Sequence, residues 1–191
     1  MKNIAIFASG SGSNAENIIR YFDAHPLIRI DSVWSNKKDA FVLERSIRLG
    51  VEAHSFSRAD LTESNILLTE LKRRNIDLIV LAGFLWLVPK TLVQNFKIVN
   101  IHPALLPAYG GKGMFGDHVH QAVIAAKEVV SGITIHLIDE EYDKGEVLLQ
   151  AKCPVLPDDT PGTLAARIHQ LEYEHFPVVI EKYVMDNLLS K

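Results

Sequence analysis

The sequence has little cysteine and no long hydrophobic run. Cys153 is the only cysteine among 191 residues, so the chain cannot form an internal disulfide and contains no CxxC pair of the kind found in zinc ribbons and thioredoxins. No apolar run approaches the roughly 20 residues that a membrane-spanning helix needs. Only the five apolar residues 4–8 follow the N-terminal Met-Lys-Asn, which is too few for a signal peptide. We therefore expect a cytoplasmic protein with no membrane partner.

The sequence also lacks an excess of basic charge. Its 20 Lys and Arg residues and 23 Asp and Glu residues give a net charge of −3, and no block of basic residues appears. A protein that binds a nucleic-acid backbone normally shows such a block, so we expect no nucleic-acid partner. Hydrophobic residues make up 48% of the chain, which at this length supports a core without disulfides or a structural metal.

Short apolar runs alternate with segments of helical period over the first hundred residues. The run 3–8 is continuous and β-prone, which is typical of a strand buried on both faces. Ile18, Ile19 and Phe22 follow it at helical spacing. The alternation then predicts strands at 28–34, 52–56, 77–82 and 97–101 and helices at 41–49 and 61–74. This pattern predicts an α/β fold with a Rossmann-like, mostly parallel sheet and helices on both faces.

The pattern changes in the second half of the chain. A short helix is expected at about 118–126. Apolar residues then alternate with Thr134 and His136 in 131–138, which is the period of a strand with two unlike faces. A strand at 146–154 follows a turn, so this pair should form an antiparallel C-terminal extension, and a helix from about 163 to 182 closes the chain. We expect one domain over residues 1–191, with a parallel half at about 1–100 and a second half at about 101–191.

The loop after the first strand is rich in glycine. Residues 10–15 read Gly-Ser-Gly-Ser-Asn-Ala, a G-x-G-x-x-A motif between a strand and a helix, where backbone N–H groups and the helix dipole favour a phosphate. A dinucleotide site would add an acidic residue at the end of the second strand, but residues 33–37 read Val-Trp-Ser-Asn-Lys. Ser13 and Asn14 instead add side-chain donors suited to a terminal monophosphate. A tight, capped turn without a ligand is the alternative.

Two polar residues stand near the carboxyl end of the strand expected at 97–101. The period of a strand places Asn100 and His102 on one face, and ligands of open α/β sheets bind beyond the carboxyl ends of the strands. An amide and an imidazole that donate to one oxygen would stabilise the oxyanion of an acyl-transfer intermediate. The alternative is a structural role, with both side chains satisfied by the backbone.

Three further groups of polar residues each have a functional and a structural interpretation. The turn 139–143 is acidic and mostly expected to be solvated, but a carboxylate of Asp143 folded over the crevice would favour the charged form of His102. His118 and His120 resemble a metal pair. Residues i and i+2 diverge by about 200° on a helix and no further ligand completes a set, so we expect no metal. Lys112 is interpreted as an exposed lysine, with anion binding as the alternative.

In combination, these residues resemble the phosphoribosylglycinamide formyltransferase family, the folate-dependent enzymes of purine biosynthesis. The resemblance covers nearly the whole chain. It rests on residues 8–14, 35–37, 82–84, 100–103, 105–107, 134, 136, 143–145 and 149–150. An Asn-x-His-Pro element with a later Asp is shared by the formyl-folate transferases, and the Gly-Ser-Gly-Ser-Asn loop narrows the resemblance to the glycinamide ribonucleotide branch.

The resemblance implies an activity and a set of site residues. The activity is transfer of the formyl group of 10-formyltetrahydrofolate, a co-substrate, to the amine of glycinamide ribonucleotide, with no permanently bound cofactor. The implied catalytic residues are Asn100, His102 and Asp143. The implied ribonucleotide-binding residues are Gly10, Ser11, Gly12, Ser13, Asn14, Pro103, His169 and Glu172. The implied folate-binding residues are Leu85, Trp86, Leu87, Val88, Ile138 and Glu141.

The sequence departs from the commonest family pattern at three places. Many members carry Arg where Trp86 stands, and residues 112–116 resemble an insertion. His169 stands where a Gln or another polar residue often helps to hold the phosphate.

Two other functions stay open. In a formyltetrahydrofolate hydrolase, water replaces the amine, but such enzymes usually carry an N-terminal regulatory domain, which we do not expect here. A non-catalytic nucleotide-binding module is the second, and the set of Asn100, His102 and Asp143 argues against it. The expected partners are small-molecule substrates, and we expect a monomer or a homodimer.

Overall fold

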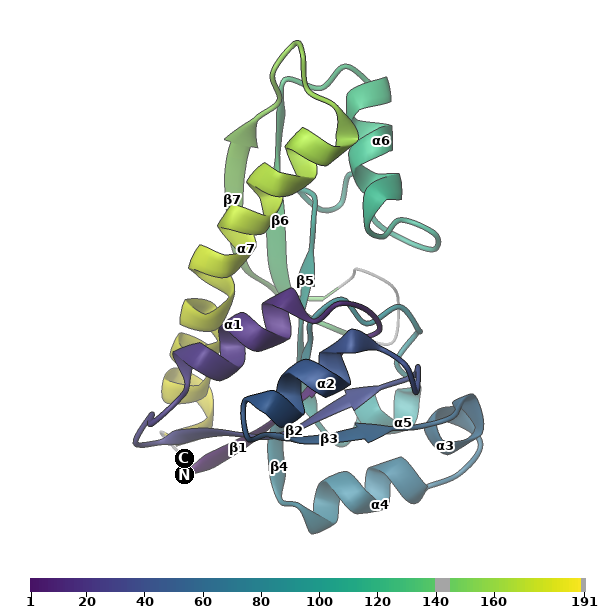
Figure 1. Ribbon diagram of the computed structural model, residues 1–191, viewed down its shortest axis with the longest axis vertical. Coiled ribbons are helices and arrows are strands. Elements are labelled where there is room, and N and C mark those ends of the chain that lie inside the picture. The colour runs from purple at the N-terminus through teal and green to yellow at the C-terminus, as the bar shows by residue number, and fades with distance from the viewer. Residues whose placement is uncertain (140–144, 190–191) are drawn as a thin grey trace.

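A seven-stranded sheet in the order β3-β2-β1-β4-β5-β6-β7 runs through the molecule (Figure 1). The computed structural model describes residues 1–139 and 145–189. Five strands are parallel: β1 (Lys2–Phe7), β2 (Ile28–Ser35), β3 (Glu52–Ser55), β4 (Ile76–Leu81) and β5 (Lys97–His102). The last two, β6 (Val130–Leu137) and β7 (Val147–Pro154), are antiparallel to their neighbours. The predicted Rossmann-like α/β fold with an antiparallel C-terminal extension is confirmed.

Helices cover both faces of this sheet, each over its own core. One core receives side chains from α1 (Ser13–Tyr21), α2 (Phe41–Arg48), α6 (Asp117–Ala125) and α7 (Pro161–Val184). The other receives them from α3 (Arg58–Thr62) and α4 (Ile66–Arg73), and Leu92 of α5 (Lys90–Val93) joins it. Successive residues of β1 alternate between the two cores, which explains why this strand is apolar throughout.

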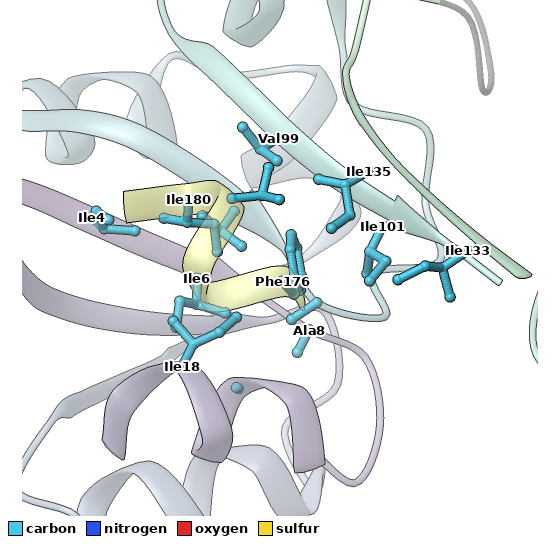
Figure 2. Close-up of a cluster of buried hydrophobic side chains, with 14 of the residues drawn as sticks. Ile4, Ile6, Ala8, Ile18, Val99, Ile101, Ile133, Ile135, Phe176 and Ile180 are labelled. Atoms are coloured by element: carbon cyan, nitrogen blue, oxygen red, sulfur yellow. The ribbon is translucent and has the colours of Figure 1, made fainter. Parts of the chain in front are cut away.

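The first core is centred on α7. Figure 2 shows Phe176 and Ile180 of this helix among Ile6, Val99 and Ile135 of three strands. Phe176 is fully buried. Because α7 packs on the sheet in this way, its residues at 169 and 172 are held near the loops that follow the strands.

The helix predicted at 61–74 is two helices. Ser57 starts α3 with a capping box in which its hydroxyl accepts from the backbone of Asp60 and the Asp60 carboxylate accepts from the backbone of Ser57. The chain then breaks before α4, where Ser64 donates to the carbonyl of Asp60 and accepts from the N–H of Ile66. Side-chain bonds of this kind compete with the helical ladder, so the single-helix prediction was wrong.

Two other helices differ from the sequence prediction. The short helix α5 was not predicted, because its four residues are too few to show a period. The last helix begins at Pro161 rather than at about 163, since Thr160 caps it and proline suits the first helical position. Beyond Val184 the chain continues as a π-helical turn over Met185–Leu189.

The order of the strands defines where a ligand can bind. The chain runs from β1 outward to β2 and β3, and then returns to place β4 on the other side of β1. Loops that leave β1 and β4 therefore diverge at this point, and the crevice between them is the usual ligand position of an open α/β sheet.

Candidate active site

A cleft of about 620 Å³ lies at this crevice, beyond the carboxyl ends of β1, β4 and β5. Such a volume suits a small-molecule site. Every sequence-predicted site residue in the described ranges lines it: Gly10, Ser11, Gly12, Ser13, Asn14, Leu85, Trp86, Leu87, Val88, Asn100, His102, Pro103, Ile138, His169 and Glu172. The predicted residues Glu141 and Asp143 lie outside the described residues. The structure thus brings together side chains from positions 10 to 172 of the chain.

The glycine-rich loop is held in a conformation that only glycine fits well. Gly12 has a φ of 78°, and a Cβ placed on it would lie 2.4 Å from Val42 Cγ2. The N–H of Val42 donates to the carbonyl of Gly10 at 3.2 Å, which fixes the loop against α2. Gly12 is also the residue before α1, so the N–H groups of the first turn have no partner within the helix. They face an end of the cleft where the helix dipole favours an anion.

Ser9 ties three loops of the cleft together. Its side chain is 2% exposed, and its hydroxyl donates to Asn36 Oδ1 at 2.6 Å. The same oxygen accepts the N–H of Leu85 at 3.0 Å. The position of the apolar segment 85–88 therefore depends on a side chain of the first loop. Ser9 was not among the predicted site residues, although a small polar residue at the end of an apolar strand is a signal that could have found it.

Asn100 is oriented by a histidine on the neighbouring strand. Its Nδ2 donates to His136 Nε2 at 3.1 Å, and His136 Nδ1 donates to the carbonyl of Leu137 at 3.0 Å. The second bond defines the tautomer of His136, because a carbonyl can only accept. The two residues are direct partners in the antiparallel register of β5 and β6, so the sheet itself sets the amide direction.

His102 is anchored by the backbone of the loop that follows it. The ring is 4% exposed, and Nε2 donates to the carbonyl of Tyr109 at 2.7 Å. Tyr109 has a φ of 57°, which turns this carbonyl back toward β5. Thr134 supports the same loop, since it donates to the carbonyl of Ala104 and accepts from the N–H of Leu106.

A buried carboxylate lines the cleft. Glu172 is 5% exposed, and its Oε2 accepts from Asn14 Nδ2 at 2.8 Å and from His169 Nδ1 at 2.8 Å. The hydrogen bond that His169 donates to Glu172 raises the pKa of His169, which favours its charged form. One N–H of Asn14 Nδ2, the side-chain donor that the sequence suggested for a phosphate, is thus directed to Glu172. The second N–H of Nδ2 and the backbone N–H of Asn14 are left for an anion.

Another part of the cleft lining is an apolar wall formed by residues 85–88. Leu85 and Leu87 are 40% and 44% exposed, whereas Val88 is buried. Trp86 packs edge-on against Phe56, with 6.3 Å between the ring centroids. The Arg58 guanidinium lies 5.6 Å from the Trp86 ring centroid. This surface can accept a flat aromatic group.

Comparison with known proteins gives a consistent result. The sequence profile of the formyl transferase family matches residues 2–180. The chain belongs to the formyl transferase family.

Individual relatives and solved structures share one name. The chloroplastic phosphoribosylglycinamide formyltransferase of Arabidopsis thaliana is 38% identical over 187 residues, which cover 94% of this chain and 64% of that protein. The chain thus spans less than two thirds of that relative. Phosphoribosylglycinamide formyltransferase of Haemophilus influenzae is 35% identical, with 100% of this chain and 91% of that protein covered. A crystal structure of phosphoribosylglycinamide formyltransferase from Bacillus halodurans has a TM-score of 0.86 at 34% identity, and the match covers 97% of this chain and 96% of that one.

The two histidines of α6 in this formyl transferase point in different directions. His118 is exposed and packs edge-on against Phe115, whereas His120 is buried and lines the cleft. Within residues 1–139 and 145–189, no three His, Cys, Asp or Glu side chains are placed to hold a metal ion. None of the helices in these ranges has the length and hydrophobicity needed to cross a membrane.

Proposed function

We propose that this formyl transferase moves the formyl group of 10-formyltetrahydrofolate to the primary amine of glycinamide ribonucleotide, a step of de novo purine biosynthesis. The observation that carries the proposal is that three features meet in the lining of one cleft. The N-terminus of α1, the pair of Asn100 and His102 on β5, and the apolar segment 85–88 all line this cleft. We propose that they follow one another in this order along it. The names of the relatives support phosphoribosylglycinamide as the acceptor and formyl transfer as the reaction.

The ribonucleotide is assigned to the end of the cleft next to α1. Its phosphate would accept from the backbone N–H groups after Gly12, with His169 as a nearby cation. Glu172 and Pro103 line the path from this end toward β5. The amine of the glycinamide group then reaches Asn100 and His102.

The formyl-folate is assigned to the apolar wall. The segment 85–88 and Ile138 offer a slot for the flat pterin ring, and polar atoms of the backbone are available to recognise its edge. Glu141, which lies outside the described residues, is proposed to contribute to the same pocket. Trp86 replaces the arginine of many family members and supplies apolar surface instead of charge.

The proposed reaction is a direct transfer between the two bound substrates. The amine nitrogen attacks the formyl carbon, and the carbonyl oxygen becomes an oxyanion. One N–H of Asn100 Nδ2 is used by His136, and the second is proposed to donate to this oxyanion together with the charged ring of His102. When the intermediate collapses, its bond to N10 of the folate breaks, N10 takes up a proton and the former amine loses one.

Asp143 has two proposed tasks in this scheme. Its carboxylate would favour the charged form of His102 and orient a water that carries the proton from the amine toward N10. We further propose that the enzyme acts in the cytoplasm, as a monomer or a homodimer, with both substrates arriving from solution and no permanently bound cofactor.

The test follows the formyl carbon. The protein is incubated with ¹³C-formyl-labelled 10-formyltetrahydrofolate in the presence and absence of glycinamide ribonucleotide, and the labelled products are identified by NMR. The proposal expects a labelled formamide on the ribonucleotide and little turnover without it. Labelled formate formed at the same rate in both samples would identify a hydrolase instead. Absence of turnover in both would support a non-catalytic nucleotide-binding module.

A further inference from the structure

His120 is a polar side chain of the cleft without an assigned task. It lies on α6 and is 3% exposed, yet its ring lines the cleft. The neighbouring positions of α6 differ in burial, as expected for an amphipathic helix. Val119 and Val123 enter the core, and His118 is exposed. A histidine at position 120 is therefore not needed to fill the core and faces the ligand space.

One of the two ring nitrogens of His120 is left without a partner in the part of the chain that the structure describes. His120 Nδ1 is shielded from solvent and has no hydrogen-bond partner among the described residues. Such an atom costs about 1 to 3 kcal/mol and calls for an explanation. Asn14 Oδ1, which also belongs to a residue of this cleft, is buried without a described partner. Two such atoms in one cleft point to a ligand that brings several hydrogen-bonding groups.

The charge of His120 restricts the chemical class of the ligand group that it can bind. Burial lowers the pKa of His120 and the nearby His169 lowers it further, so the ring is neutral near pH 7. Glu172 and Asp117 also act on it electrostatically, which disfavours a phosphate at this point. A neutral imidazole has one donor and one acceptor. A hydroxyl group complements it whichever nitrogen carries the proton.

The position of His120 in the cleft indicates which part of the ribonucleotide it contacts. His120 lines the same cleft as His169 and Glu172 of α7 and His102 of β5. These groups and Asp117 of its own helix act on it electrostatically. With the phosphate at α1 and the amine at β5, the sugar must occupy the stretch between them. We propose that His120 hydrogen-bonds the hydroxyl groups of the ribose and selects ribonucleotides against deoxyribonucleotides. This inference rests on the proposed function and adds a specificity-determining residue to it.

The test compares sugars rather than activity alone. The kcat/KM values for formyl transfer are measured with glycinamide ribonucleotide and with its 2′-deoxy and 3′-deoxy analogues. Wild-type protein is expected to prefer the ribose by about tenfold or more over at least one analogue, the size of one or two hydrogen bonds. His120→Phe keeps a ring but removes both nitrogens, and should reduce this preference to within about twofold. His120→Gln, which can donate and accept, should restore part of it.

Controls separate this role from a structural one. His118→Phe makes the same chemical change on the exposed face of α6 and should leave the preference intact. An unchanged sugar preference in folded His120→Phe would overturn the inference. If that variant does not fold, the His120 ring signals of the wild-type protein are followed by NMR; they should shift with the ribonucleotide and much less with a 2′,3′-dideoxy analogue, and equal shifts would contradict the inference. Wild-type protein that formylates none of these compounds would instead contradict the proposed function.

Discussion

The functional side chains on β5 are held by partners that are fixed themselves. Asn100 donates to His136, and His136 in turn donates to the carbonyl of Leu137. His102 donates to the carbonyl of Tyr109. Both side chains therefore have their direction set in advance. The proposed oxyanion stabilisation requires this, because donors that must reorganise lose much of their effect.

This arrangement predicts that two substitutions each lower kcat strongly and that their effects are not independent. Asn100→Ala and His102→Ala should each lower kcat by roughly 10² to 10³, the usual cost of one oxyanion donor. Because the two donors serve one oxygen, the double variant should lose less than the product of the two single effects. Steady-state kinetics of the three variants measures this.

A matched substitution guards against a general effect. Asn95→Ala removes an exposed amide whose Nδ2 donates to the carbonyl of Thr91, and should leave kcat unchanged. Near-normal turnover of folded Asn100→Ala or His102→Ala would remove that residue from the mechanism. Fully multiplicative losses would mean that the two residues act on different groups.

At the residue scale the sequence predicted some of the site and not the rest. The shared face of Asn100 and His102 follows from the period of a strand. The bond from Asn100 to His136 could not be predicted, because it depends on the register of β5 against β6. Glu172 came from family resemblance alone, since nothing in the local pattern of α7 distinguishes a buried glutamate from an exposed one. The hydrogen bond from Asn14 to Glu172 likewise could not be predicted from the sequence.

At the element scale, α7 links the stability of the fold to the site, because it carries His169 and Glu172 and packs Phe176 into the core. Its start is well defined. The hydroxyl of Thr160 accepts from the N–H of Thr163 at 3.2 Å, and Thr163 Oγ1 accepts from the N–H of Thr160 at 2.9 Å. A capping box of this kind satisfies two backbone donors that the helix leaves open.

Loss of this cap has a predictable cost. Thr160→Ala should lower the free energy of unfolding by about 1 kcal/mol, because the N–H of Thr163 loses its partner. Urea titration followed by circular dichroism measures the change. Thr91→Ala, an exposed threonine of α5, is the matched control and should stay within about 0.5 kcal/mol of wild type. Equal stability of Thr160→Ala and wild type would show that the cap does not hold α7.

The strands and long helices were predictable from local patterns, whereas short elements were not. Most strands are runs of β-prone residues or show a clear alternation, and each strand was placed to within about two residues. The helices α3 and α4 were merged because their apolar period continues across Ser64, and the interruption depends on hydrogen bonds of that side chain. The strand β6 was expected to have two unlike faces, and both prove to be buried.

At the scale of the whole molecule, function follows from the order of the strands. The return of the chain from β3 to β4 opens the crevice, and the antiparallel strand β6 brings His136 to Asn100. Neither depends on any single motif. The central claim is that one cleft binds two substrates at opposite ends, with the phosphate at α1 and the pterin at the segment 85–88.

The most direct test of this claim changes one end of the cleft at a time. Ser13→Asp adds a negative charge at the first residue of α1, where it stabilises the helix but repels a phosphate. Leu87→Glu adds a charge to the exposed side of the apolar wall. KM is measured for each substrate at saturating levels of the other. We expect Ser13→Asp to raise the KM for glycinamide ribonucleotide at least tenfold with little change for formyl-folate, and Leu87→Glu to do the reverse. Equal changes in both KM values, or an unchanged ribonucleotide KM in Ser13→Asp, would contradict the account.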